Sequence, residues 1–186
     1  MALFPIYIKP NRVLIVGGGN VAFRKLIKIL EFSNDIRVIS KEFIDKFKNI
    51  TKEYSSVELI QREYQKGDID GFDIVIVATD IRLQKEIFLE SRDKKVLVNS
   101  VDDIDYCDFT FSSFIKRGDL VISISTGGVS PTLSILLKDY IQNLLPNNIE
   151  VFLRKMDKLR RELPKGKKRM DIFRRVTKKY FFKNFK

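Results

Sequence analysis

A run of apolar residues that ends in three glycines constrains this chain more than any other feature. Val13 to Val16 lead directly into Gly17, Gly18 and Gly19, and Asn20-Val21-Ala22 then begins a segment with helical spacing. This order predicts a buried strand, a tight turn and a helix N-terminus whose unpaired N–H groups and dipole attract an anion. Gly17 permits the turn, Gly19 lets the backbone approach a pyrophosphate, and Ala22 allows close packing of helix on strand. We therefore predict a dinucleotide-binding site rather than a turn alone.

Strand-like and helix-like segments alternate after this motif. The pattern predicts helices over residues 21–32, 43–53 and 81–91, and strands over 36–39, 57–60, 72–78 and 96–98. The segment 72–78 is almost wholly apolar, as expected of a central strand that is covered on both faces. Alternating strands and helices predict an α/β fold with a Rossmann-like parallel sheet in the order 3-2-1-4-5.

Ligands of such sheets bind outside the carboxyl ends of the strands. The residues there are Gly17 to Asn20, Ser40 to Glu42, Thr79 with Asp80, and Asn99 to Asp103. An acidic residue usually holds the ribose about 20 residues beyond the glycines, but this chain has Ser40-Lys41-Glu42 there. Glu42 is placed to serve the ribose, whereas Lys41 is able to accept a 2′-phosphate. The residues themselves leave NAD and NADP open.

The chain continues beyond Asn99 with an acidic loop. Residues 100–108 hold four aspartates, Asp102, Asp103, Asp105 and Asp108. Taken alone, this stretch is equally consistent with a solvated surface loop and with a site. Residues 109–111 and 120–125 are then expected to form two strands joined through residues 116–119.

A second glycine-containing stretch, Ser125 to Leu133, follows these strands. Ser130 before Pro131 is typical of a helix N-cap and first turn, so a helix is predicted to about Leu145. Gly127 and Gly128 precede it and offer backbone N–H groups to a carboxylate. The alternative is an ordinary capped loop.

Composition limits the chemistry that is possible. The 186 residues include no histidine and one cysteine, Cys107, so the commonest general base is absent, no internal disulfide forms and no metal site is predicted. Acid–base work therefore falls first to carboxylates. No apolar run approaches the roughly 20 residues of a membrane span, and the N-terminus does not resemble a signal peptide. We expect a cytoplasmic protein with neither a membrane nor a nucleic-acid partner.

The net charge of +11 belongs to the end of the chain. Residues 150–186 contain 15 Lys or Arg and 4 Asp or Glu, and residues 1–149 carry equal numbers of both signs. Apolar residues in this tail are spaced three and four apart (Ile149, Phe152, Met156, Leu159 and Leu163), which predicts a helix with a narrow packing stripe. Pro164-Lys165-Gly166 interrupts it, and a second amphipathic segment contains Met170, Phe173, Val176 and Tyr180.

Four motifs together resemble one family, that of precorrin-2 dehydrogenases and the N-terminal part of siroheme synthases. They are GGGNVAFRK (17–25), VATD (77–80), VNSVDDIDYCDF (98–109) and ISTGGVSPTL (124–133). The glycine motif is generic, whereas the aspartate loop together with STGGVSP is specific. Their order and spacing agree with the family, and the resemblance covers nearly the whole chain.

The resemblance implies an NAD-dependent oxidation of precorrin-2 to sirohydrochlorin, followed in some members by insertion of Fe²⁺. It implies a cofactor site at Gly17, Gly18, Gly19, Asn20, Val21, Lys41, Glu42, Thr79 and Asp80. Asp102 matches the loop aspartate implicated in catalysis, and the substrate site is expected at Asn99, Ser125, Thr126, Gly127 and Gly128. The family also implies a homodimer, with an NAD-binding domain over residues 1–112, a small α+β dimerisation and substrate region over 113–148 and a basic helical tail over 149–186.

Three alternatives stay open at this level. The first is a dehydrogenase that does not insert iron. The second is a nucleotide-sensing regulatory module that resembles potassium-transport regulators, although this reading expects an acid at the end of the second strand and leaves STGGVSP unexplained. The third is a nucleic-acid binder that uses the basic tail.

Overall fold

The computed structural model describes residues 11–185. The chain divides into two compact units, one that ends at Thr110 and one that begins at Phe111. Within residues 11–185, no helix combines the length and the apolar character needed to cross a bilayer.

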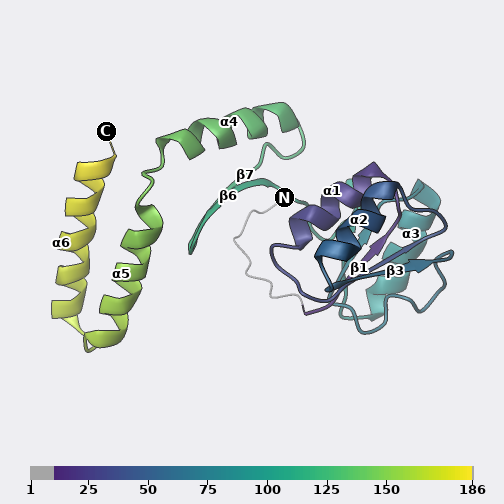
Figure 1. Ribbon diagram of the computed structural model, residues 1–186, viewed down its shortest axis with the longest axis horizontal. Coiled ribbons are helices and arrows are strands. Elements are labelled where there is room, and N and C mark those ends of the chain that lie inside the picture. The colour runs from purple at the N-terminus through teal and green to yellow at the C-terminus, as the bar shows by residue number, and fades with distance from the viewer. Residues whose placement is uncertain (1–10, 186) are drawn as a thin grey trace. The chain divides into compact units, whose positions relative to one another are not determined.

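The first unit is a five-stranded parallel sheet in the order β3-β2-β1-β4-β5, with helices packed around it (Figure 1). This confirms the predicted Rossmann-like fold. Its elements in chain order are β1 (Val13–Val16), α1 (Asn20–Ile29), β2 (Ile36–Ser40), α2 (Asp45–Glu53), β3 (Val57–Gln61), β4 (Ile74–Val77), α3 (Ile81–Glu90), the 3-10 turn η1 (Ser91–Asp93), β5 (Leu97–Ser100) and the 3-10 turn η2 (Ile104–Tyr106).

The core of this unit lies around β1 and β4. Every residue of both strands is buried, because β1 pairs with β2 on one side and with β4 on the other and helices cover the faces. On α1 the buried residues are Ala22, Leu26 and Ile29. Each fully buried Leu, Ile or Val contributes roughly 1.5–3 kcal/mol, so this centre anchors the loops at the strand ends.

Two helices differ from the predicted bounds for local reasons. The helix α1 ends at Ile29 rather than at Phe32, because the Phe32 N–H bonds the Ile29 carbonyl (2.8 Å) and tightens the last turn. The helix α2 starts at Asp45 rather than near Phe43, because the Ile44 N–H is donated to the Gly18 carbonyl (3.0 Å). The second contact also joins the loop after β2 to the glycine turn.

The second unit begins with an antiparallel hairpin of β6 (Ser113–Arg117) and β7 (Leu120–Ile124). The prediction of a strand over residues 109–111 and a loop over 116–119 was wrong. Phe109 is held at the end of β5, where its carbonyl accepts a hydrogen bond from Asn99 (2.8 Å). The strand therefore starts later and runs through Arg117, which pairs with Leu120. Gly118, at φ +59°, supplies the backbone conformation of the two-residue turn.

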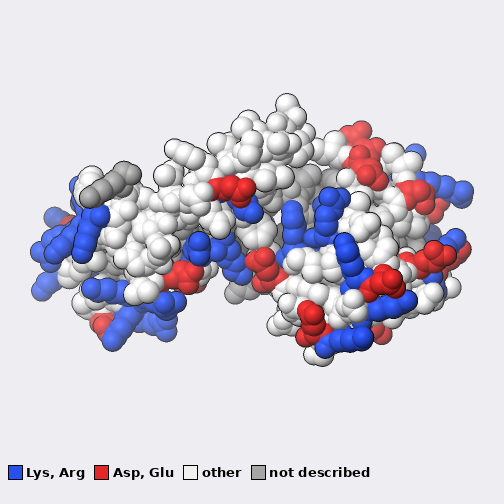
Figure 2. Space-filling model, turned by 45° about the horizontal axis from the view of Figure 1, so that its top comes forward, with Lys and Arg blue, Asp and Glu red and all other residues white. Residues whose placement is uncertain are grey.

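Three helices complete the second unit: α4 (Pro131–Leu144), α5 (Ile149–Glu162) and α6 (Lys167–Asn184). The helices α5 and α6 form an antiparallel pair (Figure 1). The rings of Phe152 and Tyr180 stack at 3.8 Å, and the Tyr180 hydroxyl donates to Asn148 Oδ1 (2.8 Å). The predicted apolar stripe is thus used for helix-on-helix packing. Figure 2 shows Lys and Arg side chains gathered over this helical pair.

Candidate functional site

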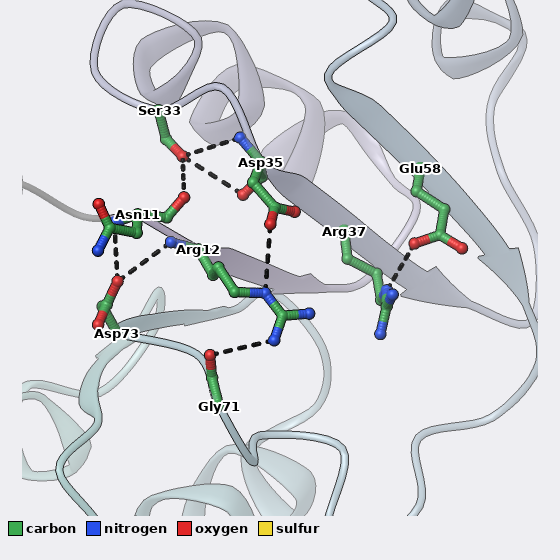
Figure 3. Close-up of polar contacts among 8 residues, drawn as sticks. All are labelled: Asn11, Arg12, Ser33, Asp35, Arg37, Glu58, Gly71 and Asp73. Carbon is green, nitrogen blue, oxygen red and sulfur yellow. Dashed lines mark hydrogen bonds and ion pairs between the residues drawn. The ribbon is translucent and has the colours of Figure 1, made fainter.

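The sheet differs between the edge where its strands begin and the edge where they end. At the edge where the strands begin, which we call the amino edge, the residues are held by structural contacts. Figure 3 shows the Arg12 guanidinium between Asp35 and Gly71. Its Nε atom lies 3.2 Å from the Asp35 carboxylate, and its Nη1 atom donates to the Gly71 carbonyl (3.4 Å). The Asp73 carboxylate accepts from the backbone N–H groups of Asn11 (2.7 Å) and Arg12 (3.1 Å). These contacts tie together the residues that precede β1, β2 and β4. The loops that carry the predicted site residues of this unit lie at the carboxyl edge.

At that edge, the three glycines after β1 have different surroundings. A Cβ atom at Gly17, where φ is +126°, would lie 2.3 Å from the Ala78 carbonyl oxygen. One at Gly18 would lie 1.9 Å from the Glu42 carbonyl oxygen. One at Gly19 would meet no described atom within 4 Å. The first two glycines are required by packing, whereas the sequence analysis assigned Gly17 to the turn and gave Gly18 no separate role. The third glycine faces open space.

This open space lies at the N-terminus of α1. Gly19 is the N-cap and makes no side-chain capping bond with any described residue, and Asn20 and Val21 are exposed. The first turn of α1 contains no acidic residue. Uncapped N–H groups and the positive end of the helix dipole suit a phosphate. The residues present therefore fit the pyrophosphate of a dinucleotide.

The loop after β2 places Lys41 and Glu42 at the surface next to the glycine turn. The Ser40 hydroxyl donates to the Glu42 carbonyl (2.7 Å) and shapes the turn. Lys41 pairs with Glu63 at 2.5 Å, and this carboxylate raises the pKa of Lys41. Glu63, which follows β3, was missed in the sequence because nothing in its local pattern indicates that it meets the end of β2.

The loop after β4 carries Thr79 and Asp80. Asp80 is the N-cap of α3, and its carboxylate accepts from the Leu83 N–H (3.1 Å). The Thr79 carbonyl accepts from Gln84 (2.7 Å). Both residues thus shape the start of α3 while they border the glycine turn through Ala78.

The aspartate loop after β5 keeps its shape through hydrogen bonds among its own residues and those of β5. The Cys107 thiol accepts from the Ser100 N–H (3.1 Å) and lies 3.0 Å from the Ser100 carbonyl, to which it donates. The Ser100 hydroxyl donates to the Tyr106 carbonyl (2.8 Å), and Asp108 accepts from the Val98 N–H (2.8 Å). Burial raises the pKa of the Cys107 thiol, so this cysteine is a structural group rather than a thiolate.

Asp102 is exposed at the start of this loop, and its carboxylate is oriented by a buried side chain. Its Oδ2 atom accepts from Gln84 Nε2 (2.9 Å), and its backbone N–H donates to Gln84 Oε1 (3.4 Å). The loops that carry Gly19, Thr79 and Asp102 all follow strands of one parallel sheet. An open glycine turn that suits an anion and an oriented carboxylate thus lie at the same edge of this unit.

Asn99 and Lys25 form a second polar contact beside this loop. Lys25 Nζ donates to Asn99 Oδ1 (3.0 Å), and burial lowers the pKa of Lys25 to about 8. Asn99 is only 2 % exposed and also donates to the Phe109 carbonyl. The predicted substrate residue Asn99 therefore lies beneath the loop surface, and Lys25 is a residue that sequence reasoning missed.

The remaining predicted substrate residues belong to the second unit. Gly127 and Gly128 are exposed at positive φ, and a Cβ on either would meet no described atom within 4 Å. The Ser125 hydroxyl accepts from the Gly127 N–H (3.2 Å). Thr126 Oγ1 accepts from the Ser130 N–H (3.1 Å) and lies 3.2 Å from the Ser134 hydroxyl. Ser130 caps α4 as predicted.

Comparisons with known proteins relate the chain to an NAD(P)-binding family and to siroheme synthases. A family model described as putative NAD(P)-binding matches residues 5–113. The siroheme synthase of Photorhabdus laumondii is 36% identical over 154 residues, which cover 80% of this chain and 32% of that protein. The siroheme synthase of Pseudoalteromonas atlantica is 31% identical over 185 residues, which cover 98% of this chain and 38% of that protein. The chain thus spans about a third of the length of these relatives.

A solved structure has the same fold. The protein titled SirC, precorrin-2 dehydrogenase, superposes with a TM-score of 0.72 over 95% of this chain and 88% of that chain, at 19% sequence identity.

Proposed function

This chain belongs to the putative NAD(P)-binding family, and from that premise we propose that it oxidises precorrin-2 to sirohydrochlorin in siroheme biosynthesis. The relatives named siroheme synthase support this reaction, as do the aspartate loop and STGGVSP motifs. One observation carries the proposal: the open turn at Gly19 and the oriented carboxylate of Asp102 both follow strands of one parallel sheet and therefore lie at the same edge of it.

NAD⁺ is the proposed hydride acceptor, bound at Gly17 to Val21 with support from Lys41, Glu42, Thr79 and Asp80. The pairing of Lys41 with Glu63 at 2.5 Å favours NAD⁺ over NADP⁺, because the ammonium group that would meet a 2′-phosphate is already paired with a carboxylate. We expect Glu63→Gln to release Lys41 and to lower KM for NADP⁺ several-fold. An unchanged ratio of kcat/KM for the two nucleotides would contradict this assignment.

The proposed reaction removes from the substrate a hydride, which a bound nicotinamide would accept, and one proton. Asp102 is proposed to accept that proton, since the chain has no histidine and this carboxylate is held at the site edge. The Gly127-Gly128 turn is proposed to bind a substrate carboxylate together with Ser125 and Thr126. Asn99, which is buried, is proposed to act on the substrate site indirectly by accepting a hydrogen bond from Lys25 and holding it in place.

The test uses the purified full chain with precorrin-2 and either NAD⁺ or NADP⁺, and follows the macrocycle spectrum and nucleotide reduction. We expect turnover in the wild type and a loss of about 10²–10⁴-fold in Asp102→Asn, the usual range for one general base. Asp105→Asn is the matched control, because it makes the same change in charge in the same exposed loop. Turnover by Asp102→Asn at the wild-type rate would remove Asp102 from the mechanism, and no turnover by the wild type would overturn the function.

Insertion of Fe²⁺ into sirohydrochlorin is a separate candidate activity, supported by the siroheme synthase relatives. Incubation of sirohydrochlorin and Fe²⁺ with and without the protein decides between a bifunctional enzyme and a dehydrogenase alone.

We also propose that the chain is a homodimer assembled through its second unit. Large apolar side chains on α4 are exposed, among them Leu136 at 60% and Tyr140 at 63%. Exposed apolar patches of this kind mark protein interfaces. We expect a dimer in light scattering and a monomer for Leu136→Asp, whereas a monomeric wild type would contradict the proposal.

A further inference from the structure

Gln84 is an unusual residue for the interior of this fold. It lies on α3 and is fully buried. Among the described residues, the only other buried side chain with an amide group is that of Asn99. Burying an amide costs several kcal/mol unless its hydrogen bonds are formed. Its partners therefore explain why it is there.

The amide of Gln84 makes three hydrogen bonds, two of them to Asp102. Its Nε2 donates to the Thr79 carbonyl (2.7 Å) and to Asp102 Oδ2 (2.9 Å). Its Oε1 accepts from the Asp102 N–H (3.4 Å). The reverse orientation of the amide would set Oε1 against two oxygen atoms that have no hydrogen to donate, so the network determines which way Gln84 points.

This arrangement does more than join two loops. To join the two loops, Gln84 needs only its hydrogen bonds to the Thr79 carbonyl and to the Asp102 backbone N–H. The third bond holds an exposed carboxylate, whose ordering costs side-chain entropy and contributes nothing to the core.

We propose that Gln84 is the positioning residue for Asp102, holding Oδ2 so that Oδ1 is presented to the substrate. This inference rests on the proposed function, in which Asp102 accepts the substrate proton. Among the described residues, Oδ1 has no hydrogen-bond partner, which agrees with its presentation to a ligand. The same amide joins this carboxylate to the loop of Thr79 and Asp80, so the proton acceptor and the proposed cofactor loop are held by one side chain.

The test is a double-mutant cycle of Gln84→Met and Asp102→Asn in the full chain. Methionine matches glutamine in length and makes none of the three bonds. We expect Gln84→Met to lower kcat about 10–100-fold and to raise KM for NAD⁺ only a few-fold, because Asp80 still fixes the Thr79 loop as the N-cap of α3. When Asp102 is already Asn, we expect no further effect on kcat. Gln65→Met, at an exposed loop position, is the control for the chemical change. Multiplicative losses in the double variant would show a merely structural role and overturn the proposal.

A measurement without turnover separates this inference from the function on which it rests. The side-chain amide of Gln84 is followed by ¹⁵N-edited NMR in the wild type and in Asp102→Ala, which changes an exposed residue. We expect hydrogen exchange of one Nε2 hydrogen to quicken at least tenfold in the variant while the hydrogen bonded to Thr79 stays protected. Unchanged exchange would refute the Gln84–Asp102 contact even in an active enzyme. A lack of turnover with this exchange pattern intact would refute the function alone.

Discussion

Two of the three adjacent glycines separate the stability of the fold from cofactor binding, because a Cβ at Gly18 would meet backbone whereas a Cβ at Gly19 would meet open space. In Gly18→Ala the new Cβ would lie 1.9 Å from the Glu42 carbonyl oxygen, a backbone atom that is held in its turn by Ser40. Relief requires a shift that loosens the bonds from Gly17 N–H to the Ile39 carbonyl (2.8 Å) and from Ile44 N–H to the Gly18 carbonyl (3.0 Å). At about 1 kcal/mol for each bond, plus repacking, we expect a loss of about 2–4 kcal/mol.

Gly19→Ala is the contrasting change. Its Cβ meets no described atom within 4 Å, and its backbone, at φ −90°, is open to any residue. Alanine is a poorer N-cap than glycine by several tenths of a kcal/mol, and the stiffer unfolded chain offsets about the same amount, so stability should stay within about 0.5 kcal/mol of wild type. The methyl group would occupy the space proposed for the pyrophosphate, and we expect Kd for NAD⁺ to rise at least tenfold.

Urea unfolding followed by circular dichroism measures the first effect, and titration calorimetry with NAD⁺ measures the second. The reasoning is refuted if Gly18→Ala is as stable as wild type, or if Gly19→Ala binds NAD⁺ with unchanged affinity.

Three further predictions concern single side chains. The pKa of Lys25 is lowered from 10.5 to about 8 by burial, so its buried charge costs stability below pH 8, and this cost is relieved as pH rises toward 10.5. We expect wild type to gain about 1–2 kcal/mol relative to Lys25→Met between pH 7 and pH 10, after allowance for solvent screening, and a flat difference in urea unfolding would contradict this. Asp80→Ala removes the N-cap of α3 and should cost about 1 kcal/mol in the same assay, with Asp93→Ala as an exposed control. Phe152→Ala breaks the stack with Tyr180 and should lower the melting temperature by several degrees, and an unchanged value would exclude this stack as a stabilising contact.

Much of the fold followed from local patterns along the chain. The apolar strand β1, the glycine turn and the apolar strand β4 predicted a parallel sheet with a nucleotide edge, because buried parallel strands must be apolar throughout and turns at positive φ favour glycine. The capping pair Ser130-Pro131 predicted the start of α4, and the apolar spacing predicted α5 and α6 with their break at Pro164. In each case the signal and the structure it predicts lie within a few residues.

The misplaced strand shows where such reasoning fails. Phe109 has the local pattern of a strand, but a hydrogen bond from Asn99 holds it at the end of β5. The identities of the two residues do not indicate this contact, and the strand therefore begins at Ser113 instead.

The sequence by itself determined the kind of sheet, the place of the open glycine turn and the residue types available for proton transfer. Only the tertiary structure decided that Gly18 is required by Glu42, that Glu63 pairs with Lys41, and that Gln84 holds Asp102. The partners in these pairs lie 18 to 24 residues apart in the chain. Their contacts exist only because parallel strands bring separate loops to one edge, and no local pattern of residues carries that information.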